Sequence, residues 1–373
     1  MPPLVATDER ARTYHRWQFG LSLAGFVLSA LYLAALLATG AAVALRDRLA
    51  ALTSSWWLEL LLCLVVLAGG YRLMTMPLSW LSGFWLPRRF GLLHQPFLRW
   101  LWDGVKAALI GGALGLLGAE IVYGLMRQTP RWWLWAGIVF FAAYALLALV
   151  APVWLAPLFY RLTPLRDKEL SDRLLALARR AGVPVLGVWI ADQSRKSRTA
   201  NAAVTGLGRT RRILLFDTLV AEFTPDETEA ILAHELAHHV HGDIWRGLAV
   251  QGALTLATFW VADKALRAGS RALHLGAPWD PAGLPLFGLI LMGVTLVALP
   301  LANGWSRHVE RQADDFALRT AAEPAAFVTA LERLGELNLA EREPHPLKEF
   351  FLYSHPSIAR RVARAKPRLR HIE

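Results

Sequence analysis

The chain has 373 residues, of which 55% are hydrophobic, and its mean hydropathy is +0.36. That composition is too apolar for an ordinary soluble domain and indicates an integral membrane protein. The net charge of +11 could suggest nucleic acid as a partner, but many basic residues flank apolar segments, which disfavours nucleic-acid binding and suits contact with anionic lipid headgroups.

Four apolar segments in the N-terminal part are long enough to cross a bilayer as helices. We predict them at residues 19–45, 56–86, 107–126 and 132–155. Arg72 and Pro77 interrupt the second segment, whose membrane part we expect to end near Met76. The first segment is too long for a cleavable signal peptide. The single cysteine, Cys63, lies in the second segment as a packing residue and excludes an intrachain disulfide.

The basic residues predict the orientation of these segments. The polar tail before the first segment has three arginines, and the loop after the second has four basic residues, whereas the two opposite loops have two arginines each. The tail, the second loop and the chain after the fourth segment therefore fall on the cytoplasmic side. The bias toward Ala, Leu and Arg suggests a high-GC bacterium, and hence the inner membrane.

The composition of residues 160–245 is that of a soluble domain. Helical periodicity runs from Lys168 to Ala181 and stops at Gly182, and two short β-branched runs, 185–190 and 212–216, predict a small sheet. A helix then begins at Thr224, a predicted N-cap, because Pro225 suits the first position and Glu227 completes a capping box.

This helix carries the motif H-E-x-x-H as His234, Glu235 and His238. Two histidines four residues apart lie on one helix face and can share a tetrahedral zinc ion. The glutamate between them can take a proton from a water molecule and later give it to a leaving amine. The motif also arises by chance on ordinary helices, so its context decides.

Two further apolar segments, 245–262 and 284–303, predict an antiparallel hairpin that returns the chain to the side it left. The loop between them has Lys264, Arg267 and Arg271 and would lie outside, in mild conflict with the charge rule. The helix after the hairpin has Glu310 and Asp314 one turn apart. The hairpin can therefore bring this helix to the H-E-x-x-H helix.

A catalytic zinc site of this type needs a third protein ligand. His241 lies on nearly the same face as His234, but a third ligand from one straight helix reaches the metal poorly. His239 points away by about 100°. Both suit interfacial or supporting roles, and Glu310 is the favoured third ligand because a remote glutamate often completes such sites.

The chain resembles the integral-membrane zinc metallopeptidases that include the CAAX prenyl proteases and the HtpX-type proteases, with the prenyl-protease branch fitting best. It departs from the CAAX proteases in lacking one N-terminal span and in having Ala237 where they usually have glycine. The matching segments are RRFGLLHQPFLRWLWDGVK, PLFYRLTPL, ANAAVTGLGRTRRILLFDTLV, HELAHHVHGD, SRHVERQAD and SHPSIARR.

The resemblance implies a zinc ion bound by His234, His238 and Glu310, with Glu235 as general base and acid. It also implies that Asp314 orients a zinc-binding imidazole, although an ordinary solvated aspartate is the alternative.

For the substrate, the resemblance implies that Asn201 and Ala202 form an edge strand that pairs with the peptide backbone, and that His355 donates to the oxyanion. From the residues alone, Asn201 is a turn residue and His355 a structural histidine. Arg361 would support either the site or an interior ion pair.

We therefore predict a mainly α polytopic membrane protein of about six transmembrane helices with a small α+β, gluzincin-like zinc-metallopeptidase domain. The expected divisions are a membrane region (1–158), a catalytic part (159–244), a hairpin (245–303) and a second catalytic part (304–373). The expected function is a zinc-dependent endopeptidase acting on membrane-associated, hydrophobic or CAAX-like peptides. The alternative is a non-catalytic zinc-binding transporter or assembly factor, which the intact Glu235 disfavours.

Overall fold

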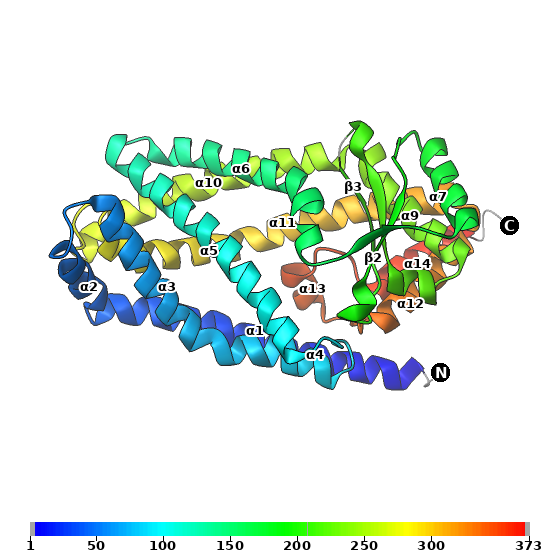
Figure 1. Ribbon diagram of the computed structural model, residues 1–373, viewed down its shortest axis with the longest axis horizontal. Coiled ribbons are helices and arrows are strands. Elements are labelled where there is room, and N and C mark those ends of the chain that lie inside the picture. Colours follow the sequence, from blue (N-terminus) through cyan, green and yellow to red (C-terminus); the bar gives the residue numbers. More distant parts are fainter. Residues whose placement is uncertain (1–3, 207, 370–373) are drawn as a thin grey trace.

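The computed structural model of the protein describes residues 4–206 and 208–369. Long helices run side by side along the longest axis, and a small sheet with shorter helices gathers at one end (Figure 1). This arrangement confirms the predicted mainly α membrane protein with a small α+β part. The helices of the long part are α1 (Leu4–Ala38), α2 (Ala41–Ala50), α3 (Trp56–Trp80), α4 (Leu86–Arg89), α5 (Phe97–Gln128), α6 (Trp132–Trp154), α10 (Asp243–Ala272) and α11 (Leu284–Thr320).

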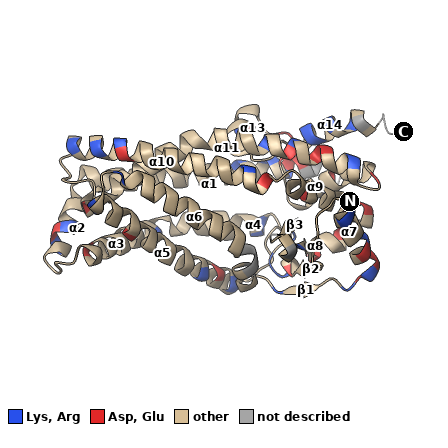
Figure 2. Ribbon diagram, turned by 90° about the horizontal axis from the view of Figure 1, so that it is seen from above, with Lys and Arg blue, Asp and Glu red and all other residues tan. Residues whose placement is uncertain are grey.

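Five of the described helical segments are long and apolar enough to cross a membrane: 8–38, 56–89, 97–128, 132–150 and 281–320. The fifth predicted span, 245–262, lies in α10, which is not among them. Arg246 stands near the start of α10, and Asp263 and Lys264 lie farther along it. Nevertheless α10 packs along α6 and α11. Seen from above, the middle of the long bundle has few charged residues, and the Lys, Arg, Asp and Glu positions gather toward its ends (Figure 2).

Several helix ends differ from the sequence predictions. The polar N-terminal tail is helical, so α1 begins before the apolar segment, and Gly40 separates α1 from α2. Gly40 has φ +70°, a left-handed conformation that costs glycine little and interrupts the helix. Pro77 does not end the second helix, because the chain passes from α3 through a π-helical turn at 81–85 into α4.

The three basic residues predicted for the loop after 262 belong to the last turns of α10. There, the buried Asp263 accepts hydrogen bonds from Trp132 Nε1 at 2.7 Å and from Arg267 Nε at 2.7 Å. A buried carboxylate needs such partners. These contacts tie the start of α6 to the end of α10.

The sheet has four strands in the order β1-β2-β4-β3. β1 and β3 are antiparallel to their neighbours, whereas β2 and β4 are parallel. The prediction of a strand at 212–216 is confirmed, and the one predicted at 185–190 is shifted toward the C-terminus. β3 lies at an edge of the sheet. The strands are β1 (Leu162–Pro164), β2 (Val188–Ala191), β3 (Ala202–Thr205) and β4 (Arg212–Phe216).

Shorter helices surround the sheet and bury a common core with it. Leu174, Leu177, Ile213, Leu215 and Leu232 are fully buried in this core. Because these residues come from α7, from the sheet and from α9, the helix that carries the H-E-x-x-H motif, the core fixes α9 against the sheet. The helices are α7 (Lys168–Arg180), α8 (Asp217–Glu222), α9 (Pro225–Val240), α12 (Ala325–Leu337), α13 (Pro346–Leu352) and α14 (Ile358–Leu369).

Candidate metal centre

The motif helix, α9, begins with the predicted capping box. Thr224 Oγ1 accepts a hydrogen bond from the backbone N–H of Glu227, and the Glu227 carboxylate accepts one from the backbone N–H of Thr224. α9 does not run straight into the next helix. Gly242, with φ +69°, separates α9 from α10, so the chain changes direction directly after the motif.

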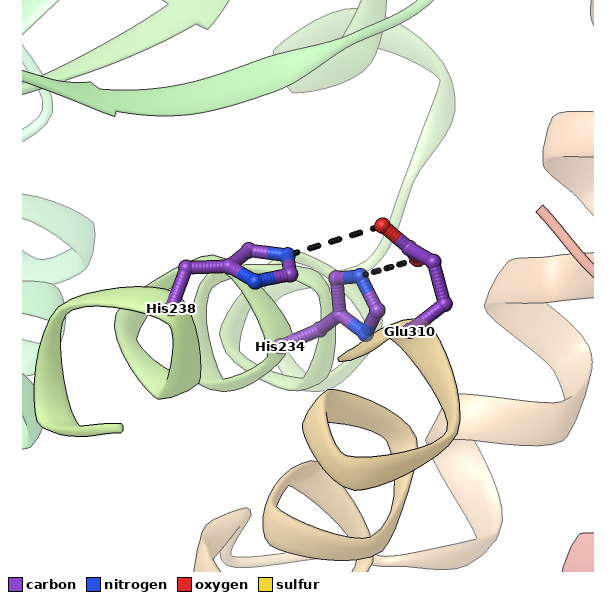
Figure 3. A group of neighbouring side chains, drawn as sticks. All are labelled: His234, His238 and Glu310. Carbon is purple, nitrogen blue, oxygen red and sulfur yellow. Dashed lines mark ion pairs between the residues drawn. The ribbon is translucent and has the colours of Figure 1, made fainter. Parts of the chain in front are cut away.

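His234 and His238 of α9 meet Glu310 of α11 in one cluster (Figure 3). The Nε2 atom of His234 lies 3.2 Å from Glu310 Oε2, and that of His238 lies 3.7 Å from Glu310 Oε1. Of the three candidates for the third ligand, Glu310 is therefore the one that the fold brings to both imidazoles. His238 and Glu310 are 72 positions apart in the sequence, and α10 and the first part of α11 bring them together.

The donors in this cluster fit a divalent metal ion. Both histidines direct Nε2 toward Glu310, and the Nδ1 atom of each contacts a separate carboxylate. His234 Nδ1 lies 3.0 Å from Asp314 Oδ1, and His238 Nδ1 lies 3.0 Å from Asp243 Oδ2. Carboxylates in this position fix the tautomer and orientation of a metal-binding imidazole. Two imidazole nitrogens and one carboxylate form the donor set of many catalytic zinc sites.

The sequence analysis did not identify Asp243 as a site residue. It is buried at the start of α10, and its second oxygen accepts a hydrogen bond from Arg246 Nη1 at 2.9 Å. The turn at Gly242 carries its side chain back toward His238. The signal in the sequence was an aspartate one residue after a glycine that ends the motif helix.

Arg361 lies behind Asp314. It donates two hydrogen bonds to the Asp314 carboxylate, at 2.6 and 2.9 Å. The predicted ion pair therefore has a defined partner. Burial alone would lower the pKa of His234, but hydrogen bonds to Asp314 and Glu310 outweigh it and raise that pKa to about 9. The carboxylates of Asp314 and Glu310 therefore favour positive charge on the His234 ring.

Glu235 lines the cleft beside the two histidines. Burial raises the pKa of its carboxyl group, because the charged form loses hydration, and the neighbouring histidines oppose this effect. A raised pKa brings a carboxylate closer to the range that suits a general base. The side chain lies on the same cleft as Asn201 and His355.

The cleft has a volume of about 320 Å³. His355 stands at its exposed side, 59% accessible, with Nδ1 2.8 Å from Glu310 Oε2. Its position after α13 lets it reach the metal ligands from the C-terminal part of the chain. Apolar side chains of α9 and α12 line another part of the cleft: Ile231, Phe327, Leu331 and Leu334.

The edge strand β3 borders this cleft. Phe216 N–H donates to Asn201 O, and Ala202 lies opposite Leu215 in the antiparallel ladder. Because bonded pairs alternate along such a ladder, Ala202 and Val204 direct their N–H and C=O groups away from β4. The Asn201 side chain turns back to accept from Ala202 N–H at 3.0 Å.

Two residues outside the predicted set hold this strand. Asn338, directly after α12, accepts from Ala200 N–H at 2.9 Å and donates to Ala200 O at 3.1 Å. The Nε2 atom of His239 lies 3.0 Å from Val204 O. His239 is therefore a contact to β3, and His241 packs edge-on against Phe316 with ring centroids 5.7 Å apart. No periodicity in the sequence marks Asn338.

Comparisons with known proteins agree with this site and fold. Residues 164–369 match the model of peptidase family M48, and residues 6–161 match the model described as CAAX prenyl protease N-terminal, five membrane helices. The two matches cover nearly the whole chain. The first contains both motif histidines, Glu235 and Glu310.

Similar proteins come from bacteria and eukaryotes. An uncharacterized metalloprotease of Bacillus subtilis is 31% identical over 79% of this chain and 70% of its own length. CAAX prenyl protease 1 of Saccharomyces cerevisiae is 31% identical over 78% and 68%, respectively. The crystal structure of S. mikatae Ste24p superposes with a TM-score of 0.82 at 25% identity, covering 97% of this chain and 90% of that one. The chain therefore belongs to peptidase family M48 and is an integral-membrane metalloprotease related to the CAAX prenyl proteases.

Proposed function

We propose that this metalloprotease is a zinc-dependent endopeptidase in which His234, His238 and Glu310 hold the metal and Glu235 is the general base. The observation that carries the proposal is the convergence of two Nε2 atoms and one carboxylate, with a second carboxylate behind each imidazole. This donor set favours zinc over calcium or magnesium, which prefer oxygen ligands.

When bound, zinc would polarise the scissile carbonyl and lower the pKa of a water molecule. Glu235 then takes the proton of the attacking water and passes it to the leaving amine. Its place in the cleft and its raised pKa support this role. The reaction is direct attack by water, so no side-chain nucleophile is required.

His355 is the proposed donor to the oxyanion that forms on the scissile carbonyl. Its exposed ring at the cleft and its distance from Glu310 support this assignment. Asn201 is proposed to assist through its amide Nδ2, since its Oδ1 already accepts from Ala202. Preorganised donors of this kind stabilise the charge that develops in the transition state.

The substrate is proposed to bind as an extended strand along β3. The outward-facing Ala202 C=O and Val204 N–H offer main-chain hydrogen bonds to any peptide backbone, whereas Ala202 N–H already donates to Asn201 Oδ1. The contact from His239 occupies Val204 O, so main-chain pairing ends there. Apolar side chains from α9 and α12 can then receive a substrate side chain.

The proposed substrates are hydrophobic, membrane-associated or CAAX-like peptides, cleaved on the cytoplasmic side of a bacterial inner membrane. The similarity to CAAX prenyl protease 1 of Saccharomyces cerevisiae supports CAAX-like peptides as substrates. The composition of the chain suggests a bacterium, where prenylated substrates are not expected. Misfolded membrane proteins and short hydrophobic peptides are therefore the preferred substrates. Membrane lipids are the surrounding partners, and no nucleic acid is expected.

Replacing Glu235 tests the mechanism. We expect Glu235→Gln to lower kcat by about 10²- to 10⁴-fold, the usual contribution of a general base, while zinc content stays at the wild-type level. The measurement is peptide cleavage by purified zinc-loaded protein together with metal analysis. The matched control is Glu222→Gln, the same substitution at an exposed residue of α8. Unchanged cleavage by Glu235→Gln would remove Glu235 from the mechanism.

Substrate class requires a separate comparison. A prenylated CAAX peptide, the same peptide without its prenyl group and an unfolded membrane protein are offered to the same preparation. Cleavage of the unfolded protein with no preference for the prenyl group supports quality control as the task. A strong preference for the prenylated peptide would assign CAAX processing instead.

A further inference from the structure

A second pocket lies between the first turns of α5 and the segment that follows α6. It has a volume of about 470 Å³ and shares no lining residue with the cleft of the metal centre. Its walls combine basic side chains with aromatic ones. The lining residues that matter here are Arg99, Trp102, Asp103, Lys106, Arg161 and Arg195.

The carboxylate in this pocket is already neutralised. Asp103 contacts Lys106 Nζ at 2.7 Å and Lys196 Nζ at 2.6 Å, and it accepts a hydrogen bond from Gln95 Nε2 at 2.8 Å. These contacts leave Asp103 with no need of another cation. Asp103 therefore pairs with the two lysines and does not neutralise the positive charge of the arginines.

Two arginines remain open. Among the residues that the structure describes, neither the Arg99 nor the Arg161 guanidinium has an ion pair or a hydrogen-bond partner, and both side chains are exposed. The third arginine, Arg195, pairs with Asp192 at 3.0 Å. Two planar guanidinium groups beside one pocket, both without a partner among the described residues, can donate hydrogen bonds to the oxygens of a phosphate group.

An apolar stripe leads away from the pocket along α5. Leu98, Trp102, Val105 and Leu109 are 75%, 60%, 37% and 67% exposed, and their spacing of three or four residues places them on one face of the helix. α5 is among the helices able to span a membrane. The basic pocket thus stands at the end of a membrane helix, with an exposed apolar track running from it.

We propose that this pocket binds an anionic glycerophospholipid. Arg99 and Arg161 contact the phosphate, Trp102 lies at the interface, and an acyl chain follows the stripe to Leu109. A soluble anion would use the arginines but not the stripe, and an uncharged lipid would use the stripe but not the arginines. The joint presence of both features selects an anionic lipid.

Native mass spectrometry of the full-length, zinc-loaded protein tests the proposal. The protein is loaded in detergent with phosphatidylglycerol or with phosphatidylcholine of the same chain length. We expect phosphatidylglycerol to be retained preferentially, and retention to fall by about tenfold or more in the double variant Arg99→Gln/Arg161→Gln. The matched control, Arg48→Gln/Arg131→Gln, removes two exposed arginines elsewhere in the membrane part and leaves retention unchanged.

A second variant tests the apolar track. Leu98→Ser/Leu109→Ser should weaken retention of phosphatidylglycerol while leaving unfolding temperature and zinc content near those of the wild type. Equal retention of phosphatidylcholine and phosphatidylglycerol, or no loss in the arginine variant, overturns the proposal. Displacement of the lipid by millimolar inorganic phosphate, with no effect of the leucine changes, would assign the pocket to a soluble anion and also overturn it.

Discussion

At the scale of residues, each imidazole of the metal centre is held from behind by its own carboxylate. Asp314 lies one helical turn after Glu310, so α11 supplies both a proposed ligand and the partner of His234. Asp243 comes from the turn after the motif and holds His238. Because these contacts fix both rings, the two Nε2 atoms face the same point without help from the metal.

Removing Asp243 should weaken metal binding. We expect Asp243→Ala to lower zinc affinity or kcat by about 10- to 100-fold, because His238 loses the partner that orients its ring. Competition with a chelating dye measures the affinity, and peptide cleavage measures kcat.

The control for Asp243 is Asp226→Asn, in the first turn of α9, at the end of that helix opposite His238. Asp226 pairs with Arg173 and lies away from the metal centre. It should leave zinc affinity unchanged. If Asp243→Ala binds zinc as tightly as the wild type and cleaves as fast, the contact to His238 is only structural.

At the scale of elements, the metal centre joins two helices that are separated in sequence by the hairpin. α11 is one continuous helix from Leu284 to Thr320, so the division predicted at residue 303 falls inside it. Its first half belongs to the membrane part and its second half carries Glu310. A metal at this point would link α9 of the catalytic end to a helix that reaches through the membrane region.

Metal removal should therefore lower stability as well as activity. We expect chelation to abolish cleavage and to lower the unfolding temperature, and added zinc to restore both. A hundredfold excess of zinc over its Kd would stabilise the native state by about 2.7 kcal/mol. Thermal unfolding at a series of free zinc concentrations measures this. An unfolding temperature independent of zinc would show that the proposed ligands hold no metal in the native state.

The edge strand allows a prediction about substrate length. In the wild type, peptides extended past Val204 should gain no main-chain contact, because His239 occupies Val204 O. In His239→Ala this acceptor is free. Peptides extended at the terminus that lies beside Val204 should therefore bind about two- to tenfold better than the short peptide. KM for peptides extended at either terminus measures the effect.

His239→Phe is the matched control for this change. Its ring still covers the strand edge but cannot donate, so extended peptides should gain nothing. A gain in both variants would show that the hydrogen bond to Val204 O limits pairing and that the bulk of the ring does not. No gain in His239→Ala would place the substrate elsewhere than on β3.

At the scale of the whole molecule, the catalytic end lies at one end of a bundle of apolar helices (Figure 1). The α2 end and the catalytic end are therefore expected on opposite sides of the membrane. From the distribution of basic residues in the loops, we expect the catalytic end to lie in the cytoplasm.

Cysteine labelling can test this orientation. The single native cysteine, Cys63, is buried, so Cys63→Ala provides a background without accessible thiols. Leu186 of the catalytic end and Leu52 between α2 and α3 are 62% and 77% exposed. In intact cells, a membrane-impermeant maleimide should label Leu52→Cys and spare Leu186→Cys. The reverse pattern would invert the orientation.

The sequence by itself determined the apolar spans, the capping box and the H-E-x-x-H motif, because each depends on residues close together in the chain. The family resemblance named Glu310, Asp314, Asn201 and His355. Local periodicity was less informative at helix ends, where Gly40, Gly242 and the turn after Pro77 decided how the backbone continued.

Only the tertiary structure decided the contacts made between distant segments. Asp243 reaches His238 because the chain turns at Gly242. Asn338 meets Ala200 across 138 positions, and His239 meets β3 through the packing of α9 on the sheet. The same holds for Arg99 and Arg161, which share a pocket only because α5 and the end of α6 lie together. A side chain's hydrogen-bond partner depends on the packing of whole elements, and no local pattern records that packing.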